Sequence, residues 1–305
     1  MKYGDLFSGI GCVPQALKKL GIDFEYVFAC DIDKHCKNNL LHNFDVETFY
    51  DDVNDITELP KVDLFTAGFP CQPFSTVNRK NAGNNHPKHD LFTQAFRCLK
   101  LCQPEIFILE NVASLTFKNN REYFNYIKSQ LDTLNGYNWT YQVMNSKDYG
   151  TPQSRNRVWF VGRRDGKPIT FPKPCPLTKY AYDIIDPNLD YEYFETKCQP
   201  VIDAIAKQEN DVIYITNGQT GKFIRFRKWE DSEWIYSLLA GGRIHVCFFN
   251  DGNYYRRELT IDELREFQNI DTEFKNICSD SQFRRQIGNG MDVGILSKLL
   301  HELLM

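Results

Sequence analysis

The stretch that decides the fold is Lys2–Gly11, which reads KYGDLFSGIG. Tyr3–Phe7 predicts a buried β-strand, and the apolar spacing of Val13–Leu20 predicts a helix that ends at Gly21. The glycine-rich turn between them lets backbone amides and a helix N-terminus come close to a polar ligand, because glycine has no side chain. A strand, a turn of this kind and a helix are typical of the start of an α/β ligand-binding fold.

The same alternation of short apolar runs and amphipathic stretches continues through the first half of the chain. This pattern is typical of strand–helix units wound into a parallel sheet, so we expect a doubly wound, Rossmann-like α/β fold. The further predicted strands are Tyr26–Cys30, Val62–Ala67, Glu105–Leu109, Trp139–Met144 and Val158–Gly162, and the helices beside them are Leu91–Leu101 and Arg121–Leu134.

The composition is that of an ordinary globular protein: 305 residues, 42% hydrophobic, 25% charged, with a net charge of −4. An acidic chain of this kind can bind nucleic acid only through local basic patches. Its ten cysteines form no CxxC pair, and no apolar run approaches the ~20 residues that span a bilayer. We therefore expect a cytoplasmic chain with reduced thiols. We expect no metal, since the only close histidine pair, His86 and His89, lacks neighbouring ligands.

The sequence becomes rich in proline after Gly166, with four prolines from Pro168 to Pro176. Because proline disrupts the interiors of helices and central strands, we expect a domain boundary there. We expect a catalytic and cofactor-binding domain over 1–167, completed by 280–305, and a smaller, irregular domain over 168–279. Thr260–Gln268 and Met291–Leu304 have helical patterns, and the second is apolar enough to pack back onto the first domain.

A carboxylate supports a cofactor site at the first turn. The turn does not complete the GxGxxG pattern, since Pro14 stands at the third glycine position. Asp31, however, follows Gly11 by 20 residues and ends the second strand, the spacing at which a carboxylate binds ribose hydroxyls. These residues predict an adenosine-bearing cofactor. Asp52 could contact the adenine, although a solvated turn explains it equally well.

Two strand ends carry candidate catalytic groups. Val62–Ala67 runs into GFPCQPFS, which places the thiol of Cys71 at the carboxyl edge of the sheet between two prolines. A lone cysteine is more often an inert buried residue, but one presented rigidly in such a turn is a candidate nucleophile. The next strand ends in Glu110, which in isolation would be a solvated surface group.

Taken in order, the motifs resemble those of the DNA cytosine-5 methyltransferase family over nearly the whole chain. Four are highly specific: DLFSGIG at 5–11, GFPCQPFS at 68–75, ENV at 110–112 and QSRNRV at 153–158. Two more, RELT at 257–260 with Glu263 and QIGN at 286–289, resemble the carboxy-terminal motifs.

The resemblance implies a mechanism and its residues. Cys71 adds to carbon 6 of cytosine while Glu110 hydrogen-bonds the base, and carbon 5 then takes the methyl group of S-adenosyl-L-methionine. Arg155 and Arg157, two apart and facing the same way, orient Glu110, the thiolate and the base. The implied cofactor-binding residues are Asp5, Phe7, Gly9, Gly11, Asp31, Asp52, Pro70 and Asn289.

The implied substrate is double-stranded DNA, from which the target cytosine is flipped into the pocket. The polar stretch 75–89 suits a loop that closes over DNA, and 168–279 holds the target-recognition region. The basic residues of 151–182 and 221–229 are local patches for a phosphate backbone. The implied DNA contacts are Gln72, Ser75, Arg79, Lys80, Arg225 and Arg227.

The chain departs from the family pattern at four places. Asp31 replaces the usual glutamate, and Asp51 replaces a glycine before Asp52. His89-Asp90 replace an Arg-Gly pair before Leu91-Phe92, and Gly290-Met291 replace a small residue and a valine. We expect a monomer, with restriction protection beside a separately acting endonuclease as the ordinary context. Two alternatives stay open: a transfer-RNA cytosine-5 methyltransferase, and a catalytically silent DNA-binding relative.

Overall fold

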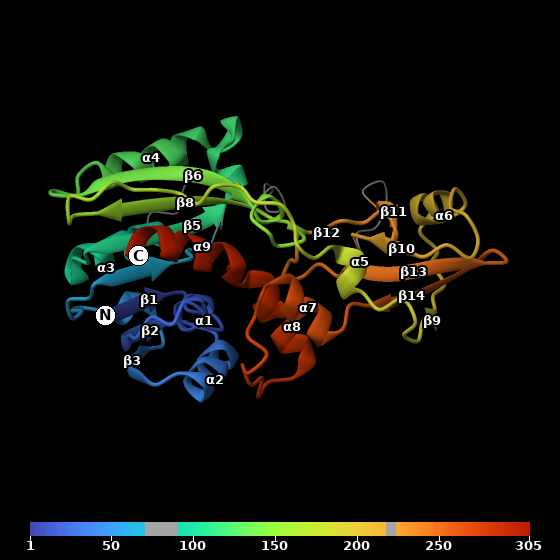
Figure 1. Ribbon diagram of the computed structural model, residues 1–305, viewed down its shortest axis with the longest axis horizontal. Coiled ribbons are helices and arrows are strands. Elements are labelled where there is room, and N and C mark those ends of the chain that lie inside the picture. The colour runs from blue at the N-terminus through green and yellow to red at the C-terminus, as the bar shows by residue number, and fades with distance from the viewer. Residues whose placement is uncertain (71–90, 218–223) are drawn as a thin grey trace.

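The computed structural model describes residues 1–70, 91–217 and 224–305 of the chain. Two sheets lie at opposite ends of the molecule, with short helices and extended segments between them (Figure 1). Both chain termini lie at the end that holds the larger sheet.

The larger sheet has seven strands in the order β3-β2-β1-β4-β5-β8-β6. All run parallel except β8, which is antiparallel to both of its neighbours. The prediction of a parallel sheet is therefore wrong at β8, because the short connection from β6 leaves no room for a crossover, so the chain must turn straight back. The strands are β1 (Lys2–Leu6), β2 (Glu25–Cys30), β3 (Val46–Tyr50), β4 (Leu64–Ala67), β5 (Ile106–Val112), β6 (Asn138–Asn145) and β8 (Asn156–Arg163).

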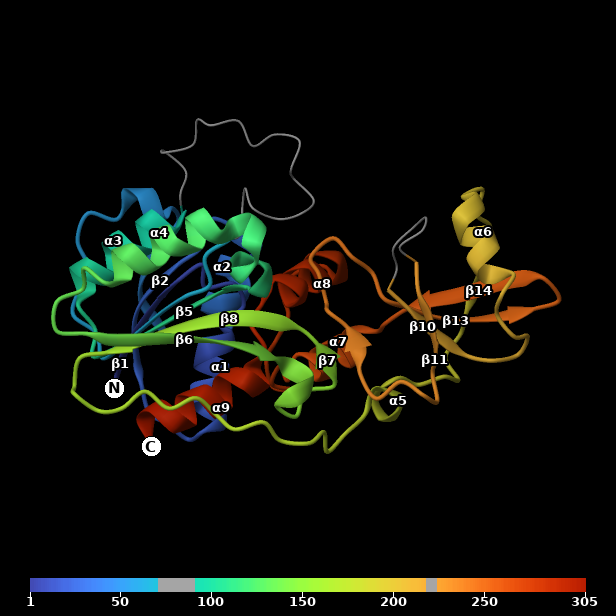
Figure 2. The same ribbon diagram turned by 90° about the horizontal axis from the view of Figure 1, so that it is seen from above.

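Helices cover both faces of this sheet, which confirms the doubly wound fold (Figure 2). On one face α9 packs against α1, so the final helix does return to the first one. On the other face α3 and α4 bury Leu99 and Ile127 over the sheet. The helices are α1 (Cys12–Lys19), α2 (Lys34–Asn43), α3 (Leu91–Cys102), α4 (Arg121–Leu131) and α9 (Val293–Leu304).

The smaller sheet has five antiparallel strands in the order β11-β10-β13-β14-β9. An aromatic cluster of its own holds it together, with Tyr214, Phe249 and Tyr254 at its centre and α6 beside it. These elements are β9 (Glu192–Tyr193), β10 (Tyr214–Thr216), β11 (Phe226–Lys228), β13 (His245–Asn250), β14 (Asn253–Glu258) and α6 (Gln199–Ile205).

Short elements join the two sheets. The proline-rich stretch 168–176 has no helix and makes one isolated bridge, between Tyr149 and Cys175. Glu263, in the first turn of α7, forms a buried ion pair with Arg257. Thr260 caps the N-terminus of the same helix. The joining elements are β7 (Gln153–Ser154), β12 (Ile235–Tyr236), α5 (Ala181–Ile184), α7 (Ile261–Phe267) and α8 (Asp280–Asn289).

Within the described ranges, no helix has both the length and the apolar character needed to cross a membrane. In the same part of the chain, no three histidine, cysteine or acidic side chains gather closely enough to hold a metal ion.

Candidate active site

The turn after β1 is built on left-handed backbone. Phe7, Gly9 and Gly11 have φ angles of 57°, 55° and 70°. At Gly11 a side chain would also collide with Leu40 and Phe44, at 2.7 and 2.8 Å, so only glycine fits. Phe7 takes the same conformation without being glycine, at a cost of about 1–3 kcal/mol of strain that the surrounding contacts must offset. The turn is therefore tightly specified at the point where the sequence predicts a cofactor.

Asp5 supports this turn from inside the protein. Its buried carboxylate accepts hydrogen bonds from Ser8 Oγ at 2.6 Å, from Tyr26 Oη at 2.6 Å and from Tyr3 Oη at 2.8 Å. Burial raises the pKa of Asp5 from 3.8 to about 6. These contacts give Asp5 a structural task behind the turn, and its predicted contact with a cofactor stays a prediction.

Asp31 links the end of β2 to the turn. One carboxylate oxygen accepts from the Gly9 amide and the other from the Asp33 amide, both at 2.8 Å. Burial raises the pKa of Asp31. The next residue, Ile32, is 80% exposed. An exposed isoleucine beside a carboxylate suits a ligand that carries both an apolar ring and hydroxyl groups. Only the unusual order acid–apolar–acid at 31–33 could have pointed to Ile32 from the sequence.

Asp52 stands at the same edge, after β3. Its side chain accepts from the Asn54 amide at 2.9 Å and so caps the short helical turn that follows. Because Asp31 and Asp52 follow paired parallel strands, both carboxylates lie at the carboxyl edge of the sheet. With Ile32 and the glycine turn, they form a set of donors, acceptors and apolar surface that fits an adenosine-bearing cofactor.

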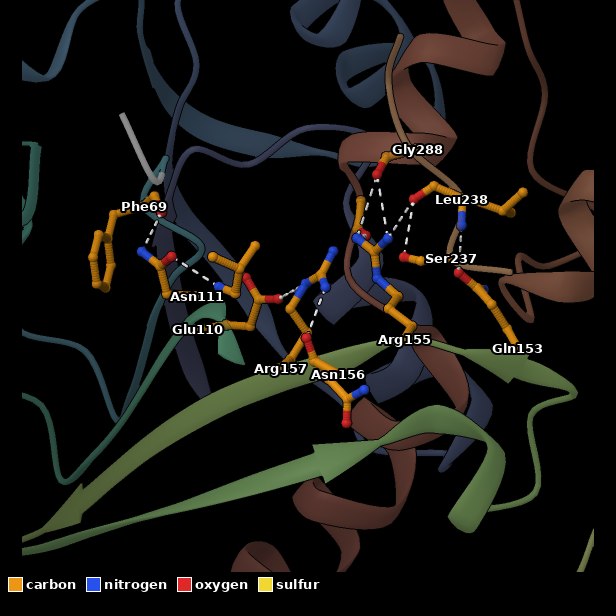
Figure 3. A network of polar contacts seen from close by, with 12 residues as sticks. Phe69, Glu110, Asn111, Gln153, Arg155, Asn156, Arg157, Ser237, Leu238 and Gly288 are labelled. Atoms are coloured by element: carbon orange, nitrogen blue, oxygen red, sulfur yellow. Dashed lines mark hydrogen bonds and ion pairs between the residues drawn. The ribbon is translucent and has the colours of Figure 1, made fainter. Parts of the chain in front are cut away.

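Glu110 and Arg157 form an ion pair at the carboxyl end of β5 (Figure 3). Arg157 Nε lies 2.9 Å from Glu110 Oε1, and each side chain is only about one-tenth exposed. The two residues come from adjacent antiparallel strands, with Arg157 paired opposite Val112. The sequence predicted both residues, and the structure brings them together.

Asn111 connects this pair to the segment that leads to the predicted nucleophile. Its side-chain amide donates to the Phe69 carbonyl at 2.9 Å, which ties the end of β5 to the end of β4. A side chain at Gly68 would lie 3.6 Å from Glu110 Oε2, so this glycine brings the backbone close to the carboxylate. Pro70 is exposed at the end of this segment. Cys71, Gln72, Ser75, Arg79 and Lys80 lie outside the described residues.

Arg155 and Arg157 project to the same side but end in different surroundings (Figure 3). Arg155 is buried and donates to the carbonyls of Leu238 and Gly290, each at 2.7 Å, and of Gly288. Burial lowers the pKa of Arg155 to about 9. Its donors thus reach three backbone carbonyls instead of Glu110. Sequence spacing predicted the direction of both side chains, but carbonyls from distant segments determine what Arg155 binds.

The carboxy-terminal motif packs against the start of α1. Asn289, a predicted cofactor contact, is exposed at the end of α8. A side chain at Gly290 would lie 3.0 Å from Cys12 Sγ, so the cysteine fills the space that a small side chain there would need. The Met291 methyl group would similarly meet a side chain at Gly68, at 2.7 Å. The departure at Gly290 and Met291 is therefore accommodated by Cys12 at the start of α1 and by Gly68 directly after β4.

The two predicted DNA-contacting arginines of the smaller sheet differ from each other. Arg225 is exposed, and its backbone amide donates to Asn217. Arg227 is half-buried: its guanidinium stacks on Trp234 at 3.9 Å from the ring centre and donates to the Trp234 carbonyl. Neither residue is part of the group around Glu110.

Comparison with known proteins identifies the family of this site. The family described as C-5 cytosine-specific DNA methylase matches residues 1–304. The chain belongs to this family. It is therefore a DNA cytosine-5 methyltransferase, as the motifs predicted, with its acidic and paired-arginine motifs at one sheet edge.

Relatives agree with this assignment, and solved structures share the fold. The chain is 31% identical over 298 residues to Type II methyltransferase M.NgoBI of Neisseria gonorrhoeae, covering 96% of this chain and 89% of the relative. It is 30% identical to M.BsuFI of Bacillus subtilis, covering 97% and 70%. In fold it resembles a Spodoptera frugiperda DNMT2 mutant (TM-score 0.72, 19% identity, 100% and 99% covered) and Entamoeba histolytica EhMeth (TM-score 0.71, 18%, 99% and 97%).

Proposed function

We propose that this methyltransferase takes its methyl group from S-adenosyl-L-methionine and acts on a cytosine flipped out of duplex DNA. The observation that carries the proposal is the Glu110–Arg157 ion pair beside Gly68, three residues before Cys71, where an added side chain would lie 3.6 Å from Glu110 Oε2. An acid and a nucleophile on neighbouring strand ends can act on the same small ring, because parallel strands deliver their carboxyl ends to one edge.

Glu110 prepares the base in this scheme. In its protonated form it donates a hydrogen bond to ring nitrogen 3 and accepts one from the exocyclic amine, which draws electron density away from carbon 6. Arg157 holds the carboxyl group in the orientation that these two bonds require. Arg155 is a positioning residue, because its hydrogen bonds fix Leu238 and Gly290 rather than a reacting atom.

Cys71 supplies the covalent step. Its sulfur forms a bond to carbon 6, carbon 5 then takes the methyl group, and a base removes the proton from carbon 5. The sulfur–carbon bond breaks as the ring double bond returns, so the thiolate leaves unchanged. Asn111, by holding the Phe69 carbonyl, fixes the segment from which this thiolate is presented.

The cofactor site is assigned to the turn after β1 and the ends of β2 and β3. When bound, S-adenosyl-L-methionine supplies an electrophilic methyl group. Asp31 would accept hydrogen bonds from its ribose hydroxyls, while Ile32 would cover the adenine ring. The glycines of the turn leave room for the amino-acid part beside the N-terminus of α1. Asp52, which is half-buried, and Asn289, which is exposed, are further predicted contacts.

Residues 168–279 are assigned to DNA recognition, with 1–167 and 280–305 forming the catalytic domain. The basic residues of 168–279 support contact with the phosphate backbone, and the short length of this region supports a short recognition sequence read from the major groove. The relatives' names, Type II methyltransferases, support a protective role beside a separately acting endonuclease. We expect the enzyme to work as a monomer.

Bisulfite sequencing tests the proposal in a host that lacks cytosine methylation. The wild-type chain should produce methylcytosine in one short context, and Cys71→Ser and Glu110→Gln should not. Lys19→Gln, at the exposed C-terminal end of α1, is the matched control and should methylate normally. Unmethylated genomic DNA together with methylated transfer RNA would contradict the proposal and favour the RNA alternative. No methylation of either by folded protein would favour a silent binder.

A further inference from the structure

A cavity of about 130 Å³ lies beside α8, away from the group around Glu110. In both views α8 sits between the two sheets (Figures 1 and 2). Three arginines line the cavity: Arg243 from the segment before β13, and Arg284 and Arg285 from α8. At about 30 Å³ per water molecule, the space holds roughly four waters, which is enough for a phosphate group.

One face of α8 packs closely against the segment 238–242, which forms the other side of the cavity. Ser281, Arg284, Arg285 and Gly288 follow one another at helical spacing and share that face. A side chain at Gly288 would lie 2.4–2.5 Å from the backbone of Leu239 and Ala240. Glycine therefore allows the helix to rest directly on the segment 238–242. This close packing brings both arginines over the cavity.

Positive charge exceeds negative charge at this cavity. Its lining contains three guanidinium groups but one carboxylate, Glu258. Arg243 pairs with Glu258 at 2.6 Å, and Arg284 lies 3.8 Å from it while also donating to the Leu259 carbonyl. Arg285 is exposed and makes no hydrogen bond or ion pair with any residue in the described part of the chain. An anion at this cavity would therefore meet a guanidinium group whose charge is not neutralised by a carboxylate of the described residues.

The cavity wall is also connected to the catalytic edge. Leu238 and Ile287 line the cavity, while the Leu238 carbonyl and the neighbouring Gly288 carbonyl accept hydrogen bonds from Arg155. An anion held here would therefore have a defined position relative to the arginine pair. Duplex DNA carries such anions at regular spacing along its backbone.

We propose that this cavity binds one backbone phosphate of the substrate DNA, with Arg285 as its principal ligand. Arg243 and Arg284 contribute positive charge, and Glu258 limits it. The phosphate would set the position of the duplex relative to the catalytic edge without reading its sequence. This inference rests on the proposed function in one respect, namely that the substrate is DNA.

Salt dependence of DNA binding tests the proposal, because each phosphate contact contributes a slope of about 0.9 in log affinity against log salt. A labelled short duplex is titrated with wild type, Arg285→Gln, Arg285→Lys and Glu258→Gln over a salt series. Arg285→Gln should lower the slope by about 0.9, while Arg285→Lys should keep it. Glu258→Gln should tighten binding. Lys19→Gln removes an exposed positive charge at the C-terminal end of α1, outside the proposed DNA patches, and should match wild type.

An unchanged slope in Arg285→Gln would overturn the proposal. Inorganic phosphate provides the second arm, since a small-anion site could show the same chemistry. If phosphate binds wild type but not Arg285→Gln while the DNA slope is unchanged, the cavity is an anion site unrelated to DNA, and the proposal is wrong. Methyl transfer by wild type is measured in parallel. Its absence, beside a lowered slope in Arg285→Gln, would contradict the proposed function while supporting the phosphate site.

Discussion

The catalytic edge of the larger sheet and the smaller sheet hold their charged side chains in different ways. At the edge, Glu110 is fixed by Arg157 from the adjacent strand, and Asp31 by backbone amides. In the smaller sheet, Arg227 is held by the face of Trp234 and Arg225 is exposed. Groups that act on a ring need fixed partners, because small displacements change reaction rates strongly. Groups that meet a phosphate backbone tolerate more freedom.

The largest expected effect is at the ion pair. Arg157→Ala leaves Glu110 without the partner that orients it, and we expect the methyl-transfer rate in single turnover to fall about 100-fold or more. Arg157→Lys should recover only part of this rate, since lysine lacks the planar fork. The free energy of unfolding, measured alongside, should fall by less than in Arg155→Met, because the Glu110–Arg157 pair keeps some exposure to solvent whereas Arg155 is buried. A wild-type rate in Arg157→Ala would show that Glu110 does not need a fixed partner, and the contrast between the catalytic edge and the smaller sheet would be wrong.

Replacing Arg155 should affect the stability of the fold more than replacing Arg157 does. Arg155→Met removes donors from the carbonyls of Leu238, Gly288 and Gly290. The Gly290 carbonyl keeps a hydrogen bond from Gln268, but a buried carbonyl that loses its donor costs about 1–3 kcal/mol. We expect urea unfolding to show a loss of about 2–5 kcal/mol, larger than for Arg157→Ala. If Arg155→Met is as stable as wild type but inactive, Arg155 is a catalytic residue and its positioning role is wrong.

The raised pKa of Asp5 should make the stability of the fold depend on pH. Its pKa of about 6 in the folded chain lies above the ordinary 3.8, so between these pH values the folded chain retains a proton that the unfolded chain has lost. Stability should therefore fall as pH rises through this range, by about 3 kcal/mol from this group alone. Asp5→Asn should lack this component when unfolding is measured at about pH 4 and about pH 7. Parallel profiles for the two proteins would contradict the prediction.

A smaller effect is expected where the carboxy-terminal motif meets α1. Gly290→Ser places a side chain 3.0 Å from Cys12 Sγ and should cost about 1–3 kcal/mol of stability through overpacking. Cys12→Ala should recover part of that loss in the double variant, because it opens the same space. Thermal unfolding of the four proteins gives the coupling energy. Additive effects would show that the two residues do not share this space.

The smallest effects are expected at Arg225 and Arg227, where one substitution should change DNA binding and the other should change stability. Arg225→Ala should lower the salt slope of DNA binding by about 0.9 without affecting stability. Arg227→Ala should instead cost about 0.5–2 kcal/mol of stability, through loss of its stacking on Trp234. DNA titrations and urea unfolding of both variants check this. An equal slope change in both would show that Trp234 does not keep Arg227 from DNA.

Much of the catalytic edge could be predicted from the sequence. Short apolar runs predict the strands, and the residue that ends such a run is expected at the carboxyl edge of the sheet. This pattern predicted the positions of Asp31 and Glu110. Asn111 and Ile32 were missed because their importance comes from contacts that no local pattern encodes: one donates to Phe69, and the other is exposed at 80%.

The sequence by itself determined the family, the order of its motifs and the elements that carry them, because these depend on residue type and short-range spacing. Only the tertiary structure decided that β8 runs antiparallel, that Arg155 binds the carbonyls of Leu238 and Gly290, and that Arg285 lies over a cavity beside Arg243. These contacts join segments separated by many residues. Their partners are chosen by packing of the whole chain, which spacing along the sequence does not specify.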